Sequence, residues 1–313
     1  MARLVLGNKL ARAAKDRPWL HRVAWGFEAS LVAVGLFIFR LLPVDRASAL
    51  GRRLIGSLGP RLARNQKFKR VLRDALPTRS ASEIDDLAAA IWGNAGAVMA
   101  EYPHLDRICR GEGRERLQIE TRASIRALEQ RDRPALFVTA HLSNFEVCAA
   151  AIRQSAGPVS VVYKSLKNPW LERRLAKYRQ SMGCRLISSD QGPKPLLSEL
   201  RAGRSVGIVM DQRHAGGTPI PFFGIPKPTT LVPARLALRC GVELVPVRAE
   251  RLNGSRFRVT FYEPVPHGDP DEPEADRVVR MTTRINGLFE QWIRERPQDW
   301  LPMRPTKDKD SGS

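Results

Sequence analysis

The residues best suited to acid–base chemistry are His141 and Glu146, which follow the apolar run 136–140. Such a run is typical of a buried strand, and ligands of open α/β sheets bind beyond the carboxyl ends of the strands. In an ideal helix five residues turn through about 500°, so these two side chains would not share a helical face. They can meet if His141 lies in the turn after the strand and Glu146 in the first turn of the next helix.

In that arrangement the Glu146 carboxylate would accept a hydrogen bond from one ring nitrogen of His141 and fix the tautomer. The other nitrogen could then take a proton from a substrate hydroxyl, so that the substrate supplies the nucleophile. Two simpler interpretations remain open. Ser143 and Glu146 also match the S-x-x-E capping box of a helix N-terminus, and His141 could be an ordinary turn histidine.

The elements that must position these residues alternate between strand-like and helix-like patterns. This alternation predicts an α/β fold with a layered sheet flanked by helices. A further strand is expected at 256–262 and a last amphipathic helix at 277–296, while the Gly-, Pro- and Thr-rich segment 213–230 is expected to be a long functional loop. The apolar runs are 136–139, 159–163, 206–210 and 244–247, and the helical stretches are 144–154, 169–182, 194–202 and 231–240.

The N-terminal part is basic and carries the most apolar window. The chain has 313 residues with 52 Lys and Arg against 32 Asp and Glu, and residues 1–80 hold 17 of the basic residues against 4 acidic ones. Ala24–Leu42 is apolar except for Glu28 and Arg40, and its length is close to the ~20 residues that a membrane-spanning helix needs. We therefore expect a helix that spans or lies on a membrane, with a buried core helix as the alternative.

These patterns divide the chain into four parts. We expect a basic N-terminal segment with a membrane-associating helix at 1–45 and a helical lead-in at 46–110. An α/β domain is expected at 111–305, followed by a disordered polar tail at 306–313.

The sequence lacks the motifs that are typical of several other classes of protein. The four cysteines stand apart with no C-x-x-C pair, which argues against a zinc ribbon or a disulfide scaffold. No G-x-S-x-G, H-E-x-x-H or G-x-G-x-x-G motif is present. A non-enzymatic nucleic-acid-binding protein is a weaker alternative, because only 7% of the residues are aromatic and the charge is not interleaved with stacking rings. A basic scaffold bound to anionic membranes remains open, and His141 would be dispensable in it.

An ordered series of motifs resembles the bacterial lipid A biosynthesis (late) acyltransferases, which belong to the H-x4-D/E acyltransferases. The resemblance covers roughly residues 20–305. It is more specific than the His–Glu spacing alone, because several blocks follow one another in the order of the family. The matching residues are His141-x4-Glu146, Lys164 with Asn168-Pro169, Arg179-x3-Gly183 and Asp211-Gln212.

The resemblance implies an acyltransferase-like α/β fold in a protein of the bacterial inner membrane that acts at the cytoplasmic face. The enzyme would move a fatty acyl chain from acyl carrier protein, or from CoA, to a hydroxyl of a lipid A precursor, without a metal or other cofactor. Another anionic glycolipid or lysolipid, such as a phosphatidylinositol mannoside, is the alternative acceptor. The net charge of +20 suits such partners, because acyl carrier protein and a phosphorylated acceptor are both acidic.

The resemblance also assigns roles to individual residues. Catalysis would fall to His141 and Glu146. Asp211 follows an apolar run as His141 does, so we expect it at the same sheet edge, where it would shape the substrate site without transferring a proton. The other substrate-binding residues would be Lys164, Asn168 and Arg179.

Overall fold

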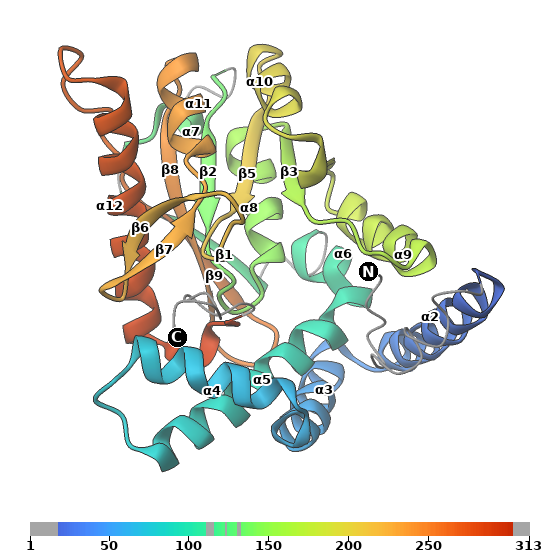
Figure 1. Ribbon diagram of the computed structural model, residues 1–313. Coiled ribbons are helices and arrows are strands. Elements are labelled where there is room, and N and C mark those ends of the chain that lie inside the picture. The colour runs from blue at the N-terminus through green and yellow to red at the C-terminus, as the bar shows by residue number, and fades with distance from the viewer. Residues whose placement is uncertain (1–17, 111–115, 123, 130–132, 303–313) are drawn as a thin grey trace.

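The computed structural model describes residues 18–110, 116–122, 124–129 and 133–302. A sheet runs through the middle of the molecule with helices on both faces, and the N-terminal helices gather below the carboxyl ends of its central strands (Figure 1). This arrangement confirms the expected α/β fold. The tail expected at 306–313 lies outside the described residues.

The main sheet has seven strands in the order β1-β9-β8-β2-β5-β3-β4. All neighbouring strands are parallel except β8 and β9, which form an antiparallel pair. The strands expected at 136–139 and 159–163 have those bounds, and the strand expected at 256–262 is β9. The strands of this sheet are β1 (Leu117–Thr121), β2 (Leu136–Thr139), β3 (Val159–Tyr163), β4 (Arg185–Ser188), β5 (Ser205–Val209), β8 (Leu244–Arg251) and β9 (Phe257–Phe261).

Strand β2 lies at the centre of the sheet and is buried along its whole length. Leu136 and Val138 face one hydrophobic core and Phe137 faces the other, as expected for a strand covered on both sides. The first core is closed by α4 (Arg64–Ala75), α5 (Ala81–Glu101), α10 (Lys194–Arg201), α11 (Val232–Cys240) and α12 (Glu274–Glu295). The second is closed mainly by α6 (Leu105–Cys109) and α8 (Glu146–Ala156), and the short α7 (Arg126–Glu129) lies against α8.

The segment expected to be a loop at 213–230 contains a two-stranded antiparallel hairpin, β6 (Thr218–Phe222) and β7 (Ile225–Thr229). Its four prolines face one another in pairs across the two strands. Proline has no N–H to donate, so it fits a strand only where no backbone hydrogen bond to the partner strand is needed. In this hairpin the prolines occupy every second position, opposite one another, which meets that condition. The hairpin packs on α12. The loop expected from the Gly, Pro and Thr content of this segment is therefore wrong, because its prolines are compatible with a pair of strands.

The N-terminal helices are joined through a close helix crossing. Here α3 (Val44–Leu58) lies against α5, and a Cβ atom on Gly96 would stand 2.2 Å from the Gly51 carbonyl oxygen. Only glycine permits that approach of two backbones. Helix α5 begins with a capping box in which Ser80 accepts from the Glu83 N–H and Glu83 accepts from the Ser80 N–H. The short turns η1 (Gly59–Arg61) and η2 (Tyr102–His104) connect these helices.

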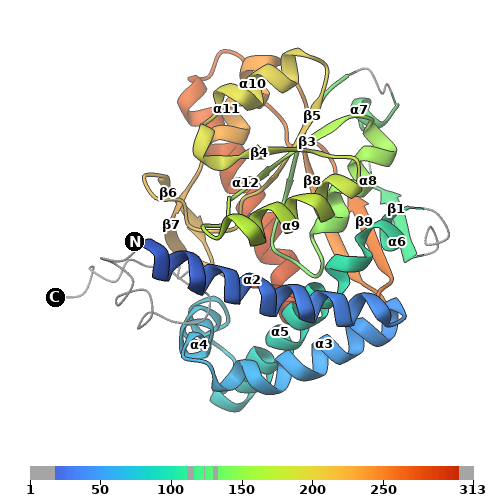
Figure 2. The same ribbon diagram turned by 90° about the vertical axis from the view of Figure 1, so that its right-hand side faces the viewer.

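Helix α2 (Pro18–Leu41) contains the apolar window. It lies lengthwise across the body, next to α9 (Pro169–Ser181) on one side and to α3 and α5 on the other (Figure 2). Residues Trp19–Leu41 are long and apolar enough to cross a membrane, and only 11% of the most apolar part is buried. A core helix would be enclosed on all sides, so this low burial argues against the core-helix alternative.

Candidate active site

His141 lies just beyond the carboxyl end of β2, in a turn that the C-terminal segment holds in place. The His141 carbonyl accepts a hydrogen bond of 2.9 Å from the Leu301 N–H, and the Ser143 N–H donates to the Asp299 carbonyl at 2.7 Å. Leu142 and Trp300 form an isolated antiparallel bridge between the two segments. The backbone that presents His141 is thus fixed by residues about 160 positions further along the chain.

The ring of His141 contacts Asp211. Nδ1 of His141 lies 2.6 Å from Oδ1 of Asp211, and the side chains are 17% and 1% exposed. Thr139 at the end of β2 pairs with Val209 at the end of the parallel strand β5. His141 and Asp211 each follow two positions later, so they lie side by side at this edge of the sheet. Sequence reasoning placed Asp211 at this edge but did not pair it with the histidine.

Asp211 is held as an anion by its surroundings. Its Oδ2 accepts a hydrogen bond of 2.9 Å from Trp300 Nε1, and its backbone carbonyl accepts one of 2.9 Å from Lys227 Nζ. Burial alone would raise the pKa of Asp211, but attraction to His141, the hydrogen bonds from His141 and Trp300, and the Lys227 charge together lower it. A carboxylate accepts, so the Nδ1 atom of His141 donates and carries the proton.

The ring of His141 also lies against Gln212. The amide Nε2 of Gln212 is 3.0 Å from Nε2 of His141 and 3.2 Å from Nδ1. Because it is almost equally far from both nitrogens, the amide lies over the face of the ring and not on the in-plane axis of the Nε2 lone pair. The edge of the Phe145 ring packs on the imidazole, with 4.7 Å between ring centroids. Gln212 follows Asp211 in the motif, and this position was its only sequence signal.

Lys227 is a second residue that the sequence did not single out. It is 1% exposed, lies on β7 of the hairpin, and places its Nζ over the Phe222 ring at 3.5 Å from the centroid. Burial lowers its pKa to about 8, although the charges of Asp211 and Glu290 act in the opposite direction. The hairpin thus carries a buried cation to the backbone of Asp211.

Glu146 has other partners than the one expected from the spacing. Its carboxylate accepts hydrogen bonds from Arg179, the shortest at 2.7 Å, and from the Tyr102 hydroxyl at 2.5 Å. The His141 Nδ1 atom is already paired with Asp211, and a largely buried guanidinium attracts the Glu146 carboxylate to the α9 side. The orienting contact expected between Glu146 and His141 is therefore replaced by two separate contacts, the hydrogen bond of His141 to Asp211 and the ion pair of Glu146 with Arg179.

The alternative role of Glu146 in a capping box with Ser143 is also not found in the structure. Helix α8 begins at Glu146 with Phe145 as its N-cap, and no side chain makes a capping hydrogen bond there. Ser143, the expected cap, has a positive φ of 53°, which turns the chain between His141 and the helix. The charge of Glu146 contributes, after burial, to the raised pKa of Tyr102. Glu146 thus belongs to a buried cluster with Arg179 and Tyr102.

Asn168 and Lys164 occupy different environments at the carboxyl end of β3. The Asn168 side-chain oxygen caps α9 by accepting from Trp170 N, and its amide donates to Glu28 Oε2 at 2.9 Å and to Trp25 O at 3.0 Å. It is 5% exposed, and its polar atoms bind these protein groups. Lys164 is exposed and remains a candidate for contact with a charged substrate.

A second buried network lies under the turn that carries His141. Glu101 is fully buried and accepts hydrogen bonds from Ser48 at 2.6 Å, from Asn144 at 2.9 Å and from Arg251. Arg251 ends β8, the other neighbour of β2 in the sheet. These contacts tie α3, α5 and β8 to the turn that carries His141, so the N-terminal helices form part of the support of the candidate site.

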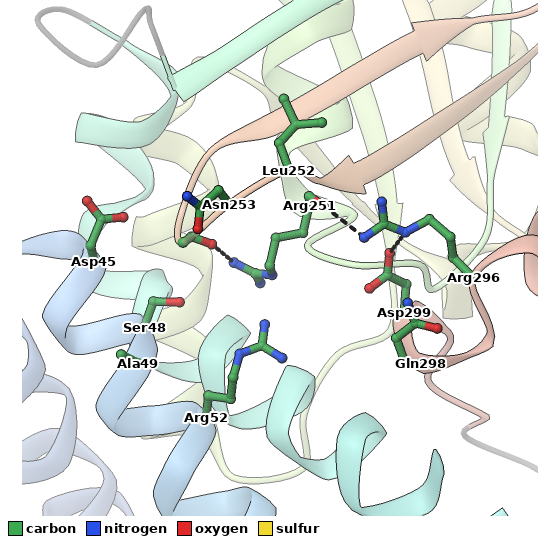
Figure 3. Close-up of a pocket in the computed structure, with 11 residues that line it drawn as sticks. Asp45, Ser48, Ala49, Arg52, Arg251, Leu252, Asn253, Arg296, Gln298 and Asp299 are labelled. Carbon is green, nitrogen blue, oxygen red and sulfur yellow. Dashed lines mark hydrogen bonds and ion pairs between the residues drawn. The ribbon is translucent and has the colours of Figure 1, made fainter. Parts of the chain in front are cut away.

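A cavity of about 350 Å³ opens beside this network and not over His141 (Figure 3). Two of its guanidinium groups have partners: Arg251 binds Glu101 and the Gly254 carbonyl, and Arg296 binds Asp299. The lining residues do not include His141 or Asp211. The cavity is therefore separate from the contact between His141 and Asp211. We take this pair as the candidate active site because its side chains are suited to acid–base chemistry.

Within the described residues, no group of three or more His, Cys, Asp or Glu side chains is arranged to hold a metal ion. All four cysteines are free; Cys109, Cys148 and Cys184 are buried and Cys240 is half-buried. Burial raises the pKa of the Cys148 thiol to about 12, so this side chain, close to the turn, is a thiol and not a thiolate nucleophile.

The fold and the site together define a class of protein. It is an α/β protein with a histidine and a buried carboxylate at the carboxyl edge of its sheet, an arrangement suited to general-base catalysis. The family model described as bacterial lipid A biosynthesis acyltransferase matches residues 12–305 of this chain. The chain therefore belongs to the bacterial lipid A biosynthesis acyltransferase family, which confirms the resemblance seen in the motifs.

Characterised relatives carry related names. The chain is 24% identical to the phosphatidylinositol mannoside acyltransferase of Mycolicibacterium smegmatis over 281 residues, which cover 87% of this chain and 89% of that protein. It is 26% identical over 176 residues to the protein of the same name from Mycobacterium tuberculosis, covering 55% of this chain and 54% of the relative. The crystal structure of a 1-acyl-sn-glycerophosphate acyltransferase from Thermotoga maritima matches with 14% identity, 79% and 96% coverage of the two chains and a TM-score of 0.34.

Proposed function

We propose that this acyltransferase moves a fatty acyl chain from a thioester donor, acyl carrier protein or CoA, to a hydroxyl of a lipid A precursor. The observation that carries the proposal is the 2.6 Å contact between His141 and the buried Asp211, in a chain that belongs to this family. Such a pair can activate a hydroxyl without a protein nucleophile or a metal ion.

The proposed reaction begins at Nε2 of His141. With Nδ1–H donated to Asp211, Nε2 takes the proton of the acceptor hydroxyl as that oxygen attacks the thioester carbonyl. The tetrahedral intermediate then expels the thiolate, which takes the proton back from the imidazolium. Asp211 stays ionised throughout and stabilises the imidazolium, a role stronger than the site-shaping one expected from sequence.

Gln212 lies beside the place proposed for the acceptor hydroxyl. Its amide is 3.0 Å from Nε2 of His141, the atom that would receive the proton, and 3.2 Å from Nδ1. Because the amide lies over the ring face, the in-plane lone pair of Nε2 remains open to a substrate hydroxyl. Gln212 is half-buried, as expected for a residue at the floor of an accessible site.

The charge of the chain and its family support the proposed acceptor and donor. The basic chain suits an acidic carrier protein and a phosphorylated glycolipid. Lys164 is exposed beyond β3 and is placed to meet such a charge. A phosphatidylinositol mannoside is the second candidate acceptor, because relatives of this chain bear that name. We place the protein on the bacterial inner membrane, at the cytoplasmic face, where both candidate acceptors present their head groups to a soluble donor.

A competition assay tests this proposal. The purified protein is given labelled acyl carrier protein or acyl-CoA together with a lipid A precursor, a phosphatidylinositol mannoside and a lysophospholipid, and mass spectrometry identifies the acylated lipid. We expect one added acyl chain on the lipid A precursor, and a deletion strain should lack that chain. Acylation of the mannoside alone would select the second acceptor, and acylation of none of the three would refute the proposal.

A further inference from the structure

Helix α2 has two unlike faces. The outer face is a continuous apolar stripe in which large side chains recur every three or four residues, the spacing of one side of a helix. These side chains are between 49% and 68% exposed. The stripe consists of Trp19, Val23, Phe27, Leu31, Val34, Phe37, Ile38 and Leu41.

The inner face is bound to the catalytic body by polar contacts. Glu28 is 2% exposed and accepts a hydrogen bond of 2.9 Å from Asn168, the residue that caps α9. The same amide donates to the Trp25 carbonyl, and near the other end of α2 the His104 ring lies 2.9 Å from the Phe39 carbonyl. Helix α2 is thus fastened to the body near its middle and near its C-terminal end.

This attachment conflicts with a helix that crosses the bilayer. Helix α9 packs beside α2, as Figure 2 shows, and carries the exposed charges of Arg173 and Arg174. If α2 crossed the hydrocarbon core while docked in this way, α9 would enter the core with it. Charged side chains are excluded from that region at a cost of several kcal/mol each, so the docked helix and the spanning helix are mutually exclusive.

We propose that α2 lies in the plane of the membrane surface, with its apolar stripe among the acyl chains and the Glu28–Asn168 contact holding it to the catalytic body. Arg22 and Arg40 are exposed and stand 18 residues apart, about five turns, so they share one edge of the stripe. Basic residues along the edge of an apolar face are the pattern of a helix that binds anionic lipid. The inference rests on the membrane location given in the proposed function.

The same surface continues to the edge of the active site. Leu166 and Trp170, in and after the loop that follows β3, are 41% and 42% exposed. A Cβ atom on Gly26 of α2 would stand 3.8 Å from the Trp170 ring, so this ring adjoins α2. That loop leaves the carboxyl edge of the sheet, where His141 lies. We therefore expect docking of α2 to bring this edge of the sheet close to the membrane surface.

A depth measurement on the full-length protein tests the inference. Single cysteines replace Val23, Leu31 or Leu41 in a Cys240→Ser background and carry an environment-sensitive fluorophore, and Val279→Cys on the exposed face of α12 is the control. Vesicles of phosphatidylcholine and phosphatidylglycerol contain quenchers placed at shallow or deep positions. We expect all three α2 labels to be quenched equally, and more by the shallow quencher than by the deep one, while the control is not quenched.

Three results would overturn the inference. Deep quenching at Leu31 with shallow quenching at Val23 and Leu41 indicates a spanning helix. No quenching at any position indicates that the stripe does not enter lipid. Labels that are shielded before vesicles are added, in a protein that sediments as a dimer, indicate that a second copy covers the stripe.

Substitution of the stripe gives an independent readout. Leu31→Glu should weaken partition into the same vesicles by about tenfold or more, because it removes the burial of one large apolar side chain and adds a charge, whereas Val279→Glu should leave partition unchanged. Equal partition of the two variants would contradict the inference. Neither experiment contains an acyl donor, so a protein that docks in this way but transfers no acyl chain would refute the proposed function and leave this inference standing.

Discussion

Nδ1 of His141 lies 2.6 Å from Oδ1 of Asp211, and the two residues stand at matching positions beyond adjacent parallel strands. This relationship replaces the His141–Glu146 contact that the spacing suggested. It separates a reactive pair, His141 with Asp211, from a supporting pair, Glu146 with Arg179. The two pairs make different experimental predictions.

Asp211→Asn should reduce kcat by about 10³- to 10⁴-fold with little change in fold. An amide at this position donates to or accepts from the ring without fixing Nδ1–H, and it does not stabilise the imidazolium. Initial rates of acyl transfer measure the effect. Asp190→Asn, at an exposed carboxylate after the edge strand β4, is the control and should behave as wild type. Comparable rates for both variants would show that Asp211 does not assist His141.

Glu146→Gln should cost stability more than chemistry. Removing one partner of a buried ion pair leaves the Arg179 charge uncompensated, which typically costs about 3 kcal/mol of unfolding free energy. The double variant Glu146→Gln, Arg179→Gln should recover part of that loss in denaturant titrations. The activity of folded Glu146→Gln should exceed that of Asp211→Asn. The reverse order of activities would restore Glu146 as the orienting residue.

Lys227 predicts a pH dependence of stability. Burial lowers its pKa to about 8 from 10.5, so between these values the unfolded chain holds more protons than the folded one. The free energy of unfolding contributed by this group therefore rises with pH through that window, by on the order of 3 kcal/mol. Lys227→Met should lack this rise. Parallel stability curves for the two proteins between about pH 8 and pH 10.5 would contradict the assignment.

The glycine crossing of α3 and α5 should be intolerant of side chains. Gly96→Ala places a Cβ atom against the Gly51 carbonyl and should lower the melting temperature and the activity together, because α5 supports the turn that carries His141. Gly35→Ala meets nothing within 4 Å and should be neutral or slightly stabilising. Similar melting temperatures for the two variants would show that the helices separate without loss.

The sequence predicted the α/β sheet well because its central strands are short, apolar and separated by helices. It placed His141 and Asp211 at one edge for the same reason. It missed the β6–β7 hairpin, because prolines in strands imitate a loop, and with it the buried Lys227. The contact of Glu146 with Arg179 depends on how α8 and α9 pack against each other. The spacing of residues along the chain does not predict that packing.

Asn168 shows the same limit for a residue of a family motif. The Asn-Pro pair suggested a substrate contact, yet Asn168 caps α9 and binds the buried Glu28 of α2. Both functions need a small side chain with a donor and an acceptor, and sequence alone does not distinguish them from ligand binding. Hydropathy found the candidate membrane helix, but its attachment to the body rests on polar contacts of Glu28, Trp25 and Phe39 that hydropathy does not record.

The most direct test of the central claim compares His141→Ala with His267→Ala in transfer of a labelled acyl chain to the glycolipid acceptor. The ring of His267 binds the carbonyl of Val242, which precedes the amino end of β8, so its variant controls for the loss of an imidazole at the opposite edge of the sheet. We predict that His141→Ala loses at least about 10³-fold in rate while His267→Ala stays within a few-fold of wild type. A His141→Ala protein that transfers acyl chains at a rate near that of wild type would contradict the account.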